Sequence, residues 1–245
     1  MNFLRLLVGS VWAAGTLLWA ALDLFLVTLR HGFRPSLEVK AVWLQRNSRR
    51  MVKIFVKQWD AAGVHPRARL LVCNHVSYVD ILVLGSITPA VFVAKSEVAG
   101  WPVFGWFAQA CGTIFVRRTV RGDVTRIGAE IRDRLHRGFL VVLFPEGTSS
   151  DGREVLPFKS SLLEPVREVG RDVFAAHVSY SRADGSPGTD VPYWGDMTLL
   201  PHMLKLFSQP RVNARVNLRA VPVLPDCRKE LARQLQDEVA RLKPA

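Results

Sequence analysis

Four short apolar runs, each the length of a buried β-strand, recur along the chain with polar or helix-like segments between them. They cover residues 69–73, 112–116, 139–144 and 173–180. Runs that are apolar throughout, rather than alternating with polar residues, are typical of strands covered on both faces. This order of segments predicts an α/β fold with a central mixed, mostly parallel sheet flanked by helices.

The segments between and after these runs predict further elements. Residues 123–137 place apolar side chains on one helical face, and Gly138 follows as a stop signal. Residues 212–220 alternate strictly between apolar and polar, which predicts a strand with one wet face near a sheet edge. Asp226 stands where the N-cap of a final amphipathic helix is expected. Residues 181–192 are rich in Gly, Pro, Asp and Ser and predict a flexible surface loop.

The N-terminal region predicts a membrane attachment. Residues 6–29 contain a single ionisable side chain, Asp23, and a helix of about 24 residues is long enough to span the hydrocarbon layer of a bilayer. We expect a spanning helix. The alternatives are a helix that lies in one leaflet, or a hairpin with residues 41–59. A cleaved signal peptide is disfavoured, because the apolar stretch is too long and no small-residue cleavage site follows it.

Positive charge follows this apolar stretch. Lys and Arg outnumber Asp and Glu by 33 to 21 in the whole chain, and Glu38 is the only acidic residue between positions 30 and 57. Such an imbalance attracts anionic membrane lipids and favours the cytoplasmic side. We therefore predict a membrane-anchoring segment at residues 1–58 and a folded domain at residues 59–245 that faces the cytoplasm. The sequence has no recognisable nucleic-acid-binding pattern, so nucleic acid is not an expected partner.

A histidine and a carboxylate follow the first apolar run. If residues 70–73 form a strand and Ser77 caps the next helix, Asn74 and His75 lie in the turn at the carboxyl end of that strand, where α/β proteins place ligands. Asp80, one turn into the helix, can accept a hydrogen bond from one imidazole nitrogen and leave the other to take a proton. The same spacing is also a plain helix-capping pattern, so Asp80 could serve only to hold the helix start.

A second polar motif, Phe-Pro-Glu-Gly-Thr at residues 144–148, follows the third apolar run. Pro145 stops the strand, Glu146 is expected to be exposed beyond it, and Gly147 can adopt backbone angles that other residues avoid. Such a turn can direct N–H groups at one point and hold an anionic oxygen or a developing oxyanion. The alternative is an ordinary turn with a solvated acid.

Other chemistries fit the sequence less well. The three cysteines form no CxxC pair, although a thiol nucleophile at Cys73 is conceivable. His75, Asp80 and Glu146 could be read as metal ligands of a hydrolase, but a second histidine or a dense acidic cluster is missing, so we expect no metal and no cofactor. A non-catalytic basic scaffold on the membrane would need only the charge and the anchor.

Together the motifs resemble the glycerophospholipid acyltransferase family, which contains the lysophosphatidate acyltransferases. The NHxxxxD block of that family matches residues 74–80, its Gly-x-x-Phe-x-x-Arg block matches residues 112–118, and its Phe-Pro-Glu-Gly-Thr block matches residues 144–148. The three blocks stand in the order and at the spacing of that family.

The resemblance implies a reaction and a set of site residues. His75 would be the general base, assisted by Asp80, and an acceptor hydroxyl would attack the thioester of acyl-CoA or acyl-carrier protein directly. The implied acceptor is a lysolipid, first of all 1-acyl-sn-glycerol-3-phosphate, which would give phosphatidic acid. The residues implied in substrate binding are Asn74, Arg118, Glu146, Gly147, Thr148 and Lys159.

Two departures from the family pattern bear on the acceptor. Ser149 stands where arginine usually follows the Glu-Gly-Thr sequence, and Ala175 stands where a proline is expected. Lys159 could supply a cation in place of that arginine, or it could be solvated. The loss of the arginine would suit a lysolipid without glycerol phosphate, such as the lyso-form of an amino-acid lipid of the ornithine type.

Overall fold

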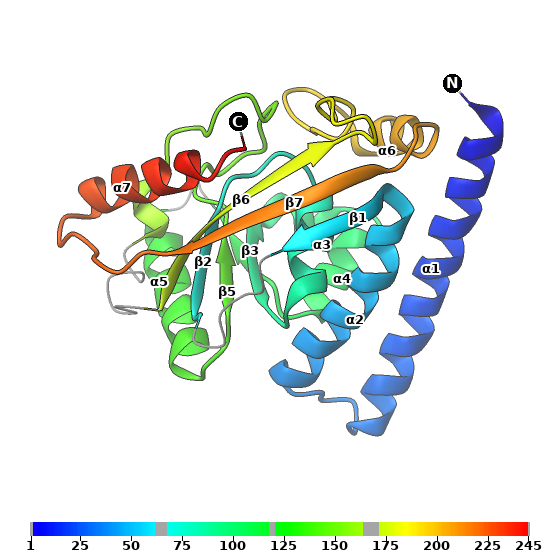
Figure 1. Ribbon diagram of the computed structural model, residues 1–245. Helices are drawn as coiled ribbons and strands as arrows, with labels where there is room; N and C mark the ends of the chain where they lie inside the picture. The colour runs from blue at the N-terminus through cyan, green and yellow to red at the C-terminus, as the bar shows by residue number, and fades with distance from the viewer. Residues whose placement is uncertain (1, 62–67, 118–120, 164–171, 245) are drawn as a thin grey trace.

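A computed structural model describes residues 2–61, 68–117, 121–163 and 172–244. Its centre is a seven-stranded sheet with the strand order β1-β7-β6-β2-β5-β3-β4 (Figure 1). The strands are β1 (Val56–Ala61), β2 (Leu70–Cys73), β3 (Val91–Lys95), β4 (Ile114–Val116), β5 (Val141–Leu143), β6 (Val173–Ser181) and β7 (Val212–Ala220). Neighbouring strands are parallel except β6 and β7, which are antiparallel. The predicted mixed, mostly parallel sheet is confirmed.

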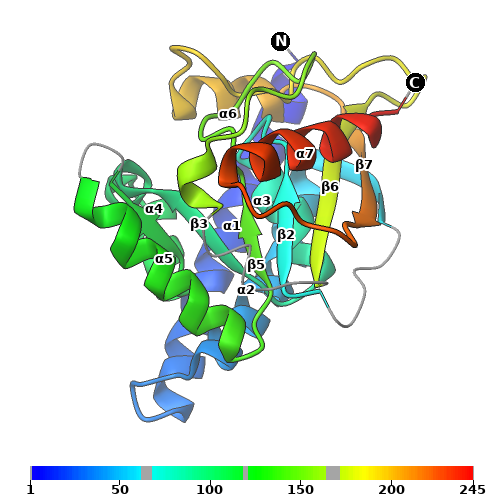
Figure 2. The same ribbon diagram turned by 90° about the vertical axis from the view of Figure 1, so that its left-hand side faces the viewer.

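Helices flank this sheet. They are α1 (Phe3–Arg30), α2 (Leu37–Phe55), α3 (Val79–Ile87), α4 (Phe104–Ala110), α5 (Arg121–His136), α6 (Leu199–Phe207) and α7 (Arg228–Arg241), with short 3-10 turns η1 (Ser96–Gly100) and η2 (Ser160–Leu162). Figure 2 shows β5, β2 and β6 side by side, with α7 crossing in front of them.

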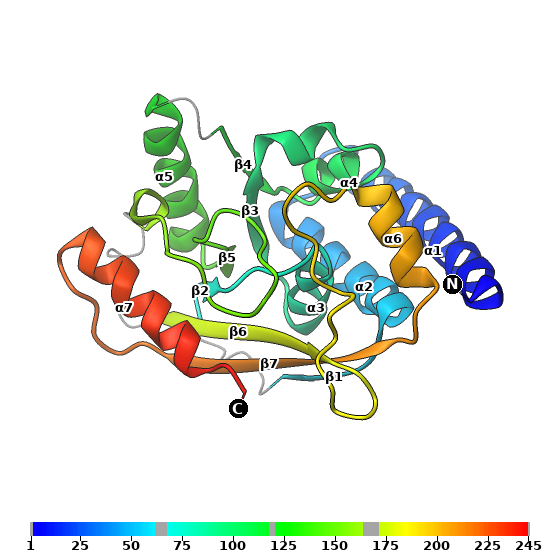
Figure 3. The same ribbon diagram turned by 90° about the horizontal axis from the view of Figure 1, so that it is seen from above.

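The two faces of the sheet are packed by different helices. Leu70 and Val72 of β2 join buried residues of α5 and α7 in one hydrophobic cluster. Leu71 and Cys73, on the other face of β2, join residues of α2, α3 and α6 in a second cluster. Because both faces are covered, the run is apolar throughout. In Figure 3, α5 and α7 lie on one side of the molecule and α1, α2 and α6 on the other.

Most elements expected from the sequence are present, with small differences at their ends. The strand at residues 212–220 lies next to the edge strand β1, as the predicted solvent-exposed face of this strand indicated. The last helix begins at Arg228 with Cys227 at the N-cap, so the prediction of Asp226 as the cap was wrong by one residue. The strands β1 and β3 were not expected.

The N-terminal helices α1 and α2 run antiparallel beside the body (Figure 1). The predicted hairpin segment at residues 41–59 is helical only to Phe55, and Trp59 lies in β1. Residues 56–59 are not helical because they belong to β1, which pairs in parallel with β7 at the edge of the sheet. The domain boundary between residues 58 and 59 stays a prediction, and β1 runs across it.

The helix α1 is long and apolar enough to cross a membrane, and most of its surface is exposed. It contacts the body through both apolar and polar residues. Ala20 and Leu24 are buried in a cluster with Trp43 of α2 and Cys111. Asp23 accepts two hydrogen bonds of 2.7 Å from Arg46 of α2 and one of 3.0 Å from Asn47. Gly9 lies against Phe207 of α6, where an added Cβ would come within 3.0 Å of the phenylalanine Cβ.

Candidate functional site

The two polar motifs meet because β2 and β5 are parallel neighbours, so their carboxyl ends lie at the same edge of the sheet. The backbone N–H of His75 donates a hydrogen bond of 2.9 Å to Oε1 of Glu146. In return, the backbone N–H of Ser150 donates to the carbonyl of His75 at 2.9 Å. The turn after β2 and the turn after β5 therefore form one structure.

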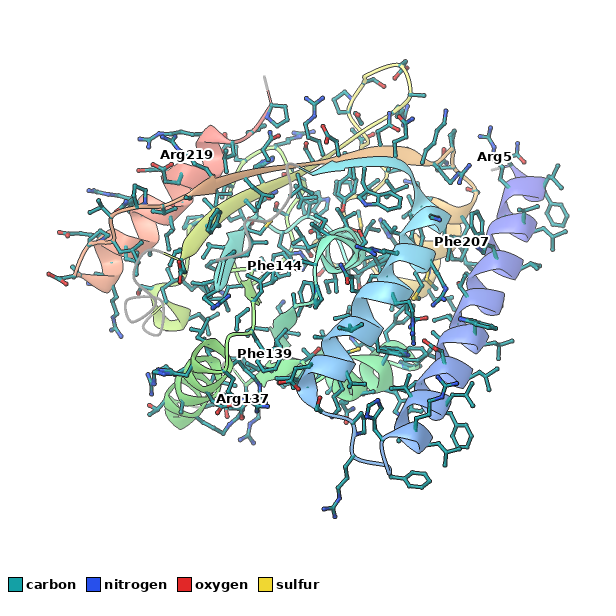
Figure 4. The ribbon with its side chains drawn as sticks, turned by 60° about the horizontal axis from the view of Figure 1, so that its bottom comes forward. Arg5, Arg137, Phe139, Phe144, Phe207 and Arg219 are labelled. Atoms are coloured by element: carbon teal, nitrogen blue, oxygen red, sulfur yellow. The ribbon has the colours of Figure 1, made fainter. Side chains whose placement is uncertain are left out.

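The imidazole of His75 is held by a buried carboxylate. Its Nδ1 lies 2.8 Å from Oδ2 of Asp80, whose side chain is 0% exposed. On its other side the ring stacks on Phe144 with the centroids 4.2 Å apart, and Figure 4 shows this phenylalanine inside the body. The histidine side chain is 20% exposed. With Nδ1 donating to the carboxylate, Nε2 is left with a lone pair that can accept a proton.

Asp80 also holds the start of α3, so both of its predicted contacts, with the imidazole and with the helix start, are present. Oδ2 accepts the backbone N–H groups of Val76 at 2.8 Å and Ser77 at 2.9 Å. The hydroxyl of Ser77 accepts the N–H of Val79, where the helix begins, one residue later than predicted. A carboxylate bound by several donors cannot rotate freely, which fixes the direction of its bond to the imidazole.

Glu146 is 2% exposed, so the expectation of an exposed acid was wrong. The side chain folds inward because the N–H of His75 binds it there. Burial raises its pKa to about 7, helped by the charge of Asp80 and opposed by the N–H groups of His75 and Leu156. Its second oxygen, Oε2, is buried and has no hydrogen-bond partner of normal geometry in the described part of the chain.

Gly147 has a φ of +72°, the left-handed conformation that the turn needs. Its N–H donates to the carbonyl of Phe144 at 3.0 Å. This N–H is therefore engaged inside the turn and does not point at the imidazole.

The remaining predicted site residues have different surroundings. Both polar atoms of Asn74 bind the backbone of Val178 in β6, at 2.7 and 3.1 Å. Thr148 and Lys159 are exposed, and Arg118 lies outside the described residues. The predicted contacts of these four residues with substrate stay predictions.

Cys73 is fully buried between the strands, and burial raises the pKa of its thiol well above the ordinary value. Since the thiolate is the reactive form, this position does not favour a nucleophile.

The sequence did not predict the part that the segment after β6 has in the site. The N–H of Tyr193 donates to the carbonyl of Val76 at 2.8 Å, and the hydroxyl of Ser149 donates to the carbonyl of Tyr193. His202 Nε2 lies 3.0 Å from the carbonyl of Pro192. The end of the predicted flexible loop is therefore fixed to both motif turns. The sequence signal that could have indicated this contact is the pair of aromatic residues, Tyr193 and Trp194, that follows Pro192.

A second tyrosine was also missed. The hydroxyl of Tyr180 on β6 donates a hydrogen bond of 2.7 Å to Oδ1 of Asp80.

Sequence comparisons agree with the motifs. A family model described as Acyltransferase matches residues 63–179. The lyso-ornithine lipid O-acyltransferase of Pseudomonas aeruginosa is 39% identical over 180 residues, which cover 73% of this chain and 69% of that protein. The enzyme of the same name from Brucella abortus is 38% identical over 188 residues, covering 71% and 70%. The 1-acyl-sn-glycerol-3-phosphate acyltransferase of Neisseria meningitidis is 34% identical over 160 residues, covering 65% and 62%.

The fold is similar to the crystal structure of the 1-acyl-sn-glycerophosphate acyltransferase PlsC from Thermotoga maritima. The TM-score is 0.62 at 20% sequence identity, and the match covers 98% of this chain and 93% of that one.

Proposed function

This chain belongs to the acyltransferase family, and we propose that it transfers a fatty acyl group from a thioester to the hydroxyl of a lysolipid through His75. The observation that supports this mechanism most is the imidazole whose Nδ1 is held by a buried carboxylate while its ring is partly exposed at the carboxyl ends of the strands. Acyl transfer needs a base at such a position and neither a metal nor a covalent intermediate.

In the proposed step, His75 Nε2 takes the proton of the acceptor hydroxyl as its oxygen attacks the thioester carbonyl carbon. The carbon–sulfur bond then breaks, and the departing sulfur takes the proton back from the imidazolium. Asp80 stabilises the imidazolium that forms between these two events. The donor is acyl-CoA or acyl-carrier protein, which both present the same thioester.

We propose a lyso-ornithine-type lipid as the acceptor. The hydroxyl of Ser149 is bound to the carbonyl of Tyr193, so position 149 offers no cation to a phosphate. In the same turn, Glu146 is a hydrogen-bond acceptor: its Oε1 binds the N–H of His75, and its Oε2 has no partner of normal geometry among the described residues. A carboxylate suits a headgroup that carries an amine better than one that carries a phosphate. Two relatives with lyso-ornithine lipid names support the same choice.

The second candidate acceptor is 1-acyl-sn-glycerol-3-phosphate. The matched Gly-x-x-Phe-x-x-Arg block at residues 112–118 and the Neisseria relative favour it.

An acceptor panel tests both candidates. Purified protein in mixed micelles is given lyso-ornithine lipid, 1-acyl-sn-glycerol-3-phosphate or a lysophosphatidylcholine, each with acyl-CoA and with acyl-carrier protein. We expect kcat/KM to be at least about 10-fold higher for the lyso-ornithine lipid. S149R should move the preference toward the phosphate acceptor, whereas S149A, which removes the hydroxyl without adding a cation, should not. A wild-type preference for the phosphate acceptor would select the second candidate, and no transfer to any lysolipid would reject the function.

We further propose that α1 lies in the cytoplasmic leaflet and does not span the bilayer. The ion pair between Asp23 and Arg46 ties α1 to α2, and Arg50 lies over the ring of Trp19 at 5.7 Å. If α1 crossed the bilayer, it would carry its partner helix with several Lys and Arg side chains into the hydrocarbon, at about 2.5–3.5 kcal/mol for each. An in-plane arrangement buries the apolar face of α1 and leaves those cations at anionic headgroups.

Cysteine labelling tests this placement. Single cysteines at either end of α1, N2C and R34C, are introduced into a C227S variant and exposed to a membrane-impermeant maleimide in sealed inverted vesicles. We expect both positions to be labelled from the cytoplasmic side. Protection of position 2 alone would show that the helix spans the membrane.

A further inference from the structure

The carboxylate of Asp80 is held on both oxygens. Oδ2 takes the imidazole of His75 and two backbone N–H groups, while Oδ1 takes the hydroxyl of Tyr180 at 2.7 Å. The tyrosine comes from β6, one hundred residues along the chain from Asp80. The other three donors come from the turn and helix start around His75 itself. Tyr180 is thus the donor that links the His75–Asp80 pair to strand β6 of the sheet.

The position of Tyr180 is set by Asn74. The side chain of Asn74 accepts the N–H of Val178 at 2.7 Å and donates to its carbonyl at 3.1 Å, which fixes β6 against the turn that carries His75. Tyr180 follows Val178 by two residues and therefore lies on the same face of the strand. The contacts form a closed ring from Asn74 through His75, Asp80 and Tyr180 back to Val178.

We propose that Tyr180 is a positioning residue for acyl transfer, whose hydroxyl holds Oδ1 of Asp80 so that Oδ2 stays aligned with Nδ1 of His75. The inference rests on the proposed function for its kinetic test only. Burial and the neighbouring Asp80 raise the pKa of Tyr180 well above its ordinary value, so the hydroxyl stays protonated and donates throughout the working pH range.

Other titratable groups also face Asp80, and their effects on the pH dependence must be distinguished from that of Tyr180. Cys73 on β2, Glu146 after β5 and His177 on β6 all interact with its charge. Burial keeps the thiol of Cys73 protonated and lowers the pKa of His177 to about 4, so both are neutral near pH 7. Glu146, with a pKa of about 7, changes its charge in the range where an imidazole titrates.

The variant Y180F tests the proposal. We expect kcat to fall about 10-fold with little change in KM for either substrate, because the lost bond orients the base and does not contact substrate. Without the hydroxyl, more negative charge remains on Asp80 and stabilises the imidazolium. The acid limb of the pH–rate profile should therefore move to higher pH, and it should do so in the E146Q background as well. Titration of the His75 ring by ¹⁵N NMR should show the same shift without any turnover.

Y78F is the matched control, because it also removes the hydroxyl of a partly buried tyrosine, one that bonds His202 instead of Asp80. It should leave the acid limb and the NMR titration in place. In a D80A background, adding Y180F should not lower kcat any further. Equal losses in wild type and D80A, or an unshifted His75 titration in Y180F, would overturn the proposal. Absence of lysolipid transfer by the wild type would reject the proposed function, while the NMR result would still decide the role of Tyr180.

Discussion

Replacement of His75 by alanine is expected to reduce turnover by at least about two orders of magnitude. The ring provides the proton-accepting nitrogen, and we find no second imidazole bound to a carboxylate among the described residues. The fold should survive the change. The turn is held by backbone groups of position 75, which bind Glu146 and Ser150 and remain in the variant. The measurement is kcat for acyl transfer at saturating donor and acceptor, with Tm measured in parallel.

The exposed His136 at the end of α5 gives a matched control, since H136A removes an imidazole far from the motif turns. It should retain wild-type turnover. If H75A kept activity within a few-fold of the wild type at an unchanged Tm, another group would have to be the base, and the proposed mechanism would fall.

The meeting of the two motif turns was predictable from the sequence for a physical reason. Apolar runs without alternation indicate strands covered on both faces, and motifs that follow parallel neighbours must share one sheet edge. The strands β2 and β5 satisfy both conditions. Local patterns also predicted the bond between Asp80 and the helix start, because the S-x-x-D spacing encodes it.

What the sequence could not show depends on distant partners. Strand β1 has the polar sequence VKQWDA and exists because it pairs with β7, which lies more than a hundred residues away. Glu146 was expected in solvent because acids rarely lie inside, and its burial depends on the N–H of His75, 71 residues earlier. Tyr180 and Tyr193 are aromatic residues that any core could use. Their hydroxyl and backbone contacts with the turns appear only once the chain is folded.

The variant D80N is expected to lower turnover by at least about 100-fold while keeping most of the stability. The asparagine carbonyl can take over the three donors that bind Oδ2, and the Tyr180 hydroxyl can rotate to accept from the new amide. The geometry is kept, but the negative charge that stabilises the imidazolium is lost. D80A differs, because it leaves buried donors unsatisfied at about 1–3 kcal/mol each, so its Tm should fall clearly below that of D80N. Turnover and Tm of both variants provide the comparison.

If Asp80 acts through His75, the two losses cannot add. The double variant H75A/D80N should be about as slow as H75A alone, because a carboxylate has no imidazolium to stabilise once the ring is gone. Additive losses would mean that Asp80 has a second role in catalysis, and Glu146, whose pKa is raised in part by the charge of Asp80, would then be the first residue to examine. A D80N enzyme with near wild-type turnover would instead reduce Asp80 to a helix cap, the alternative that its spacing in the sequence had left open.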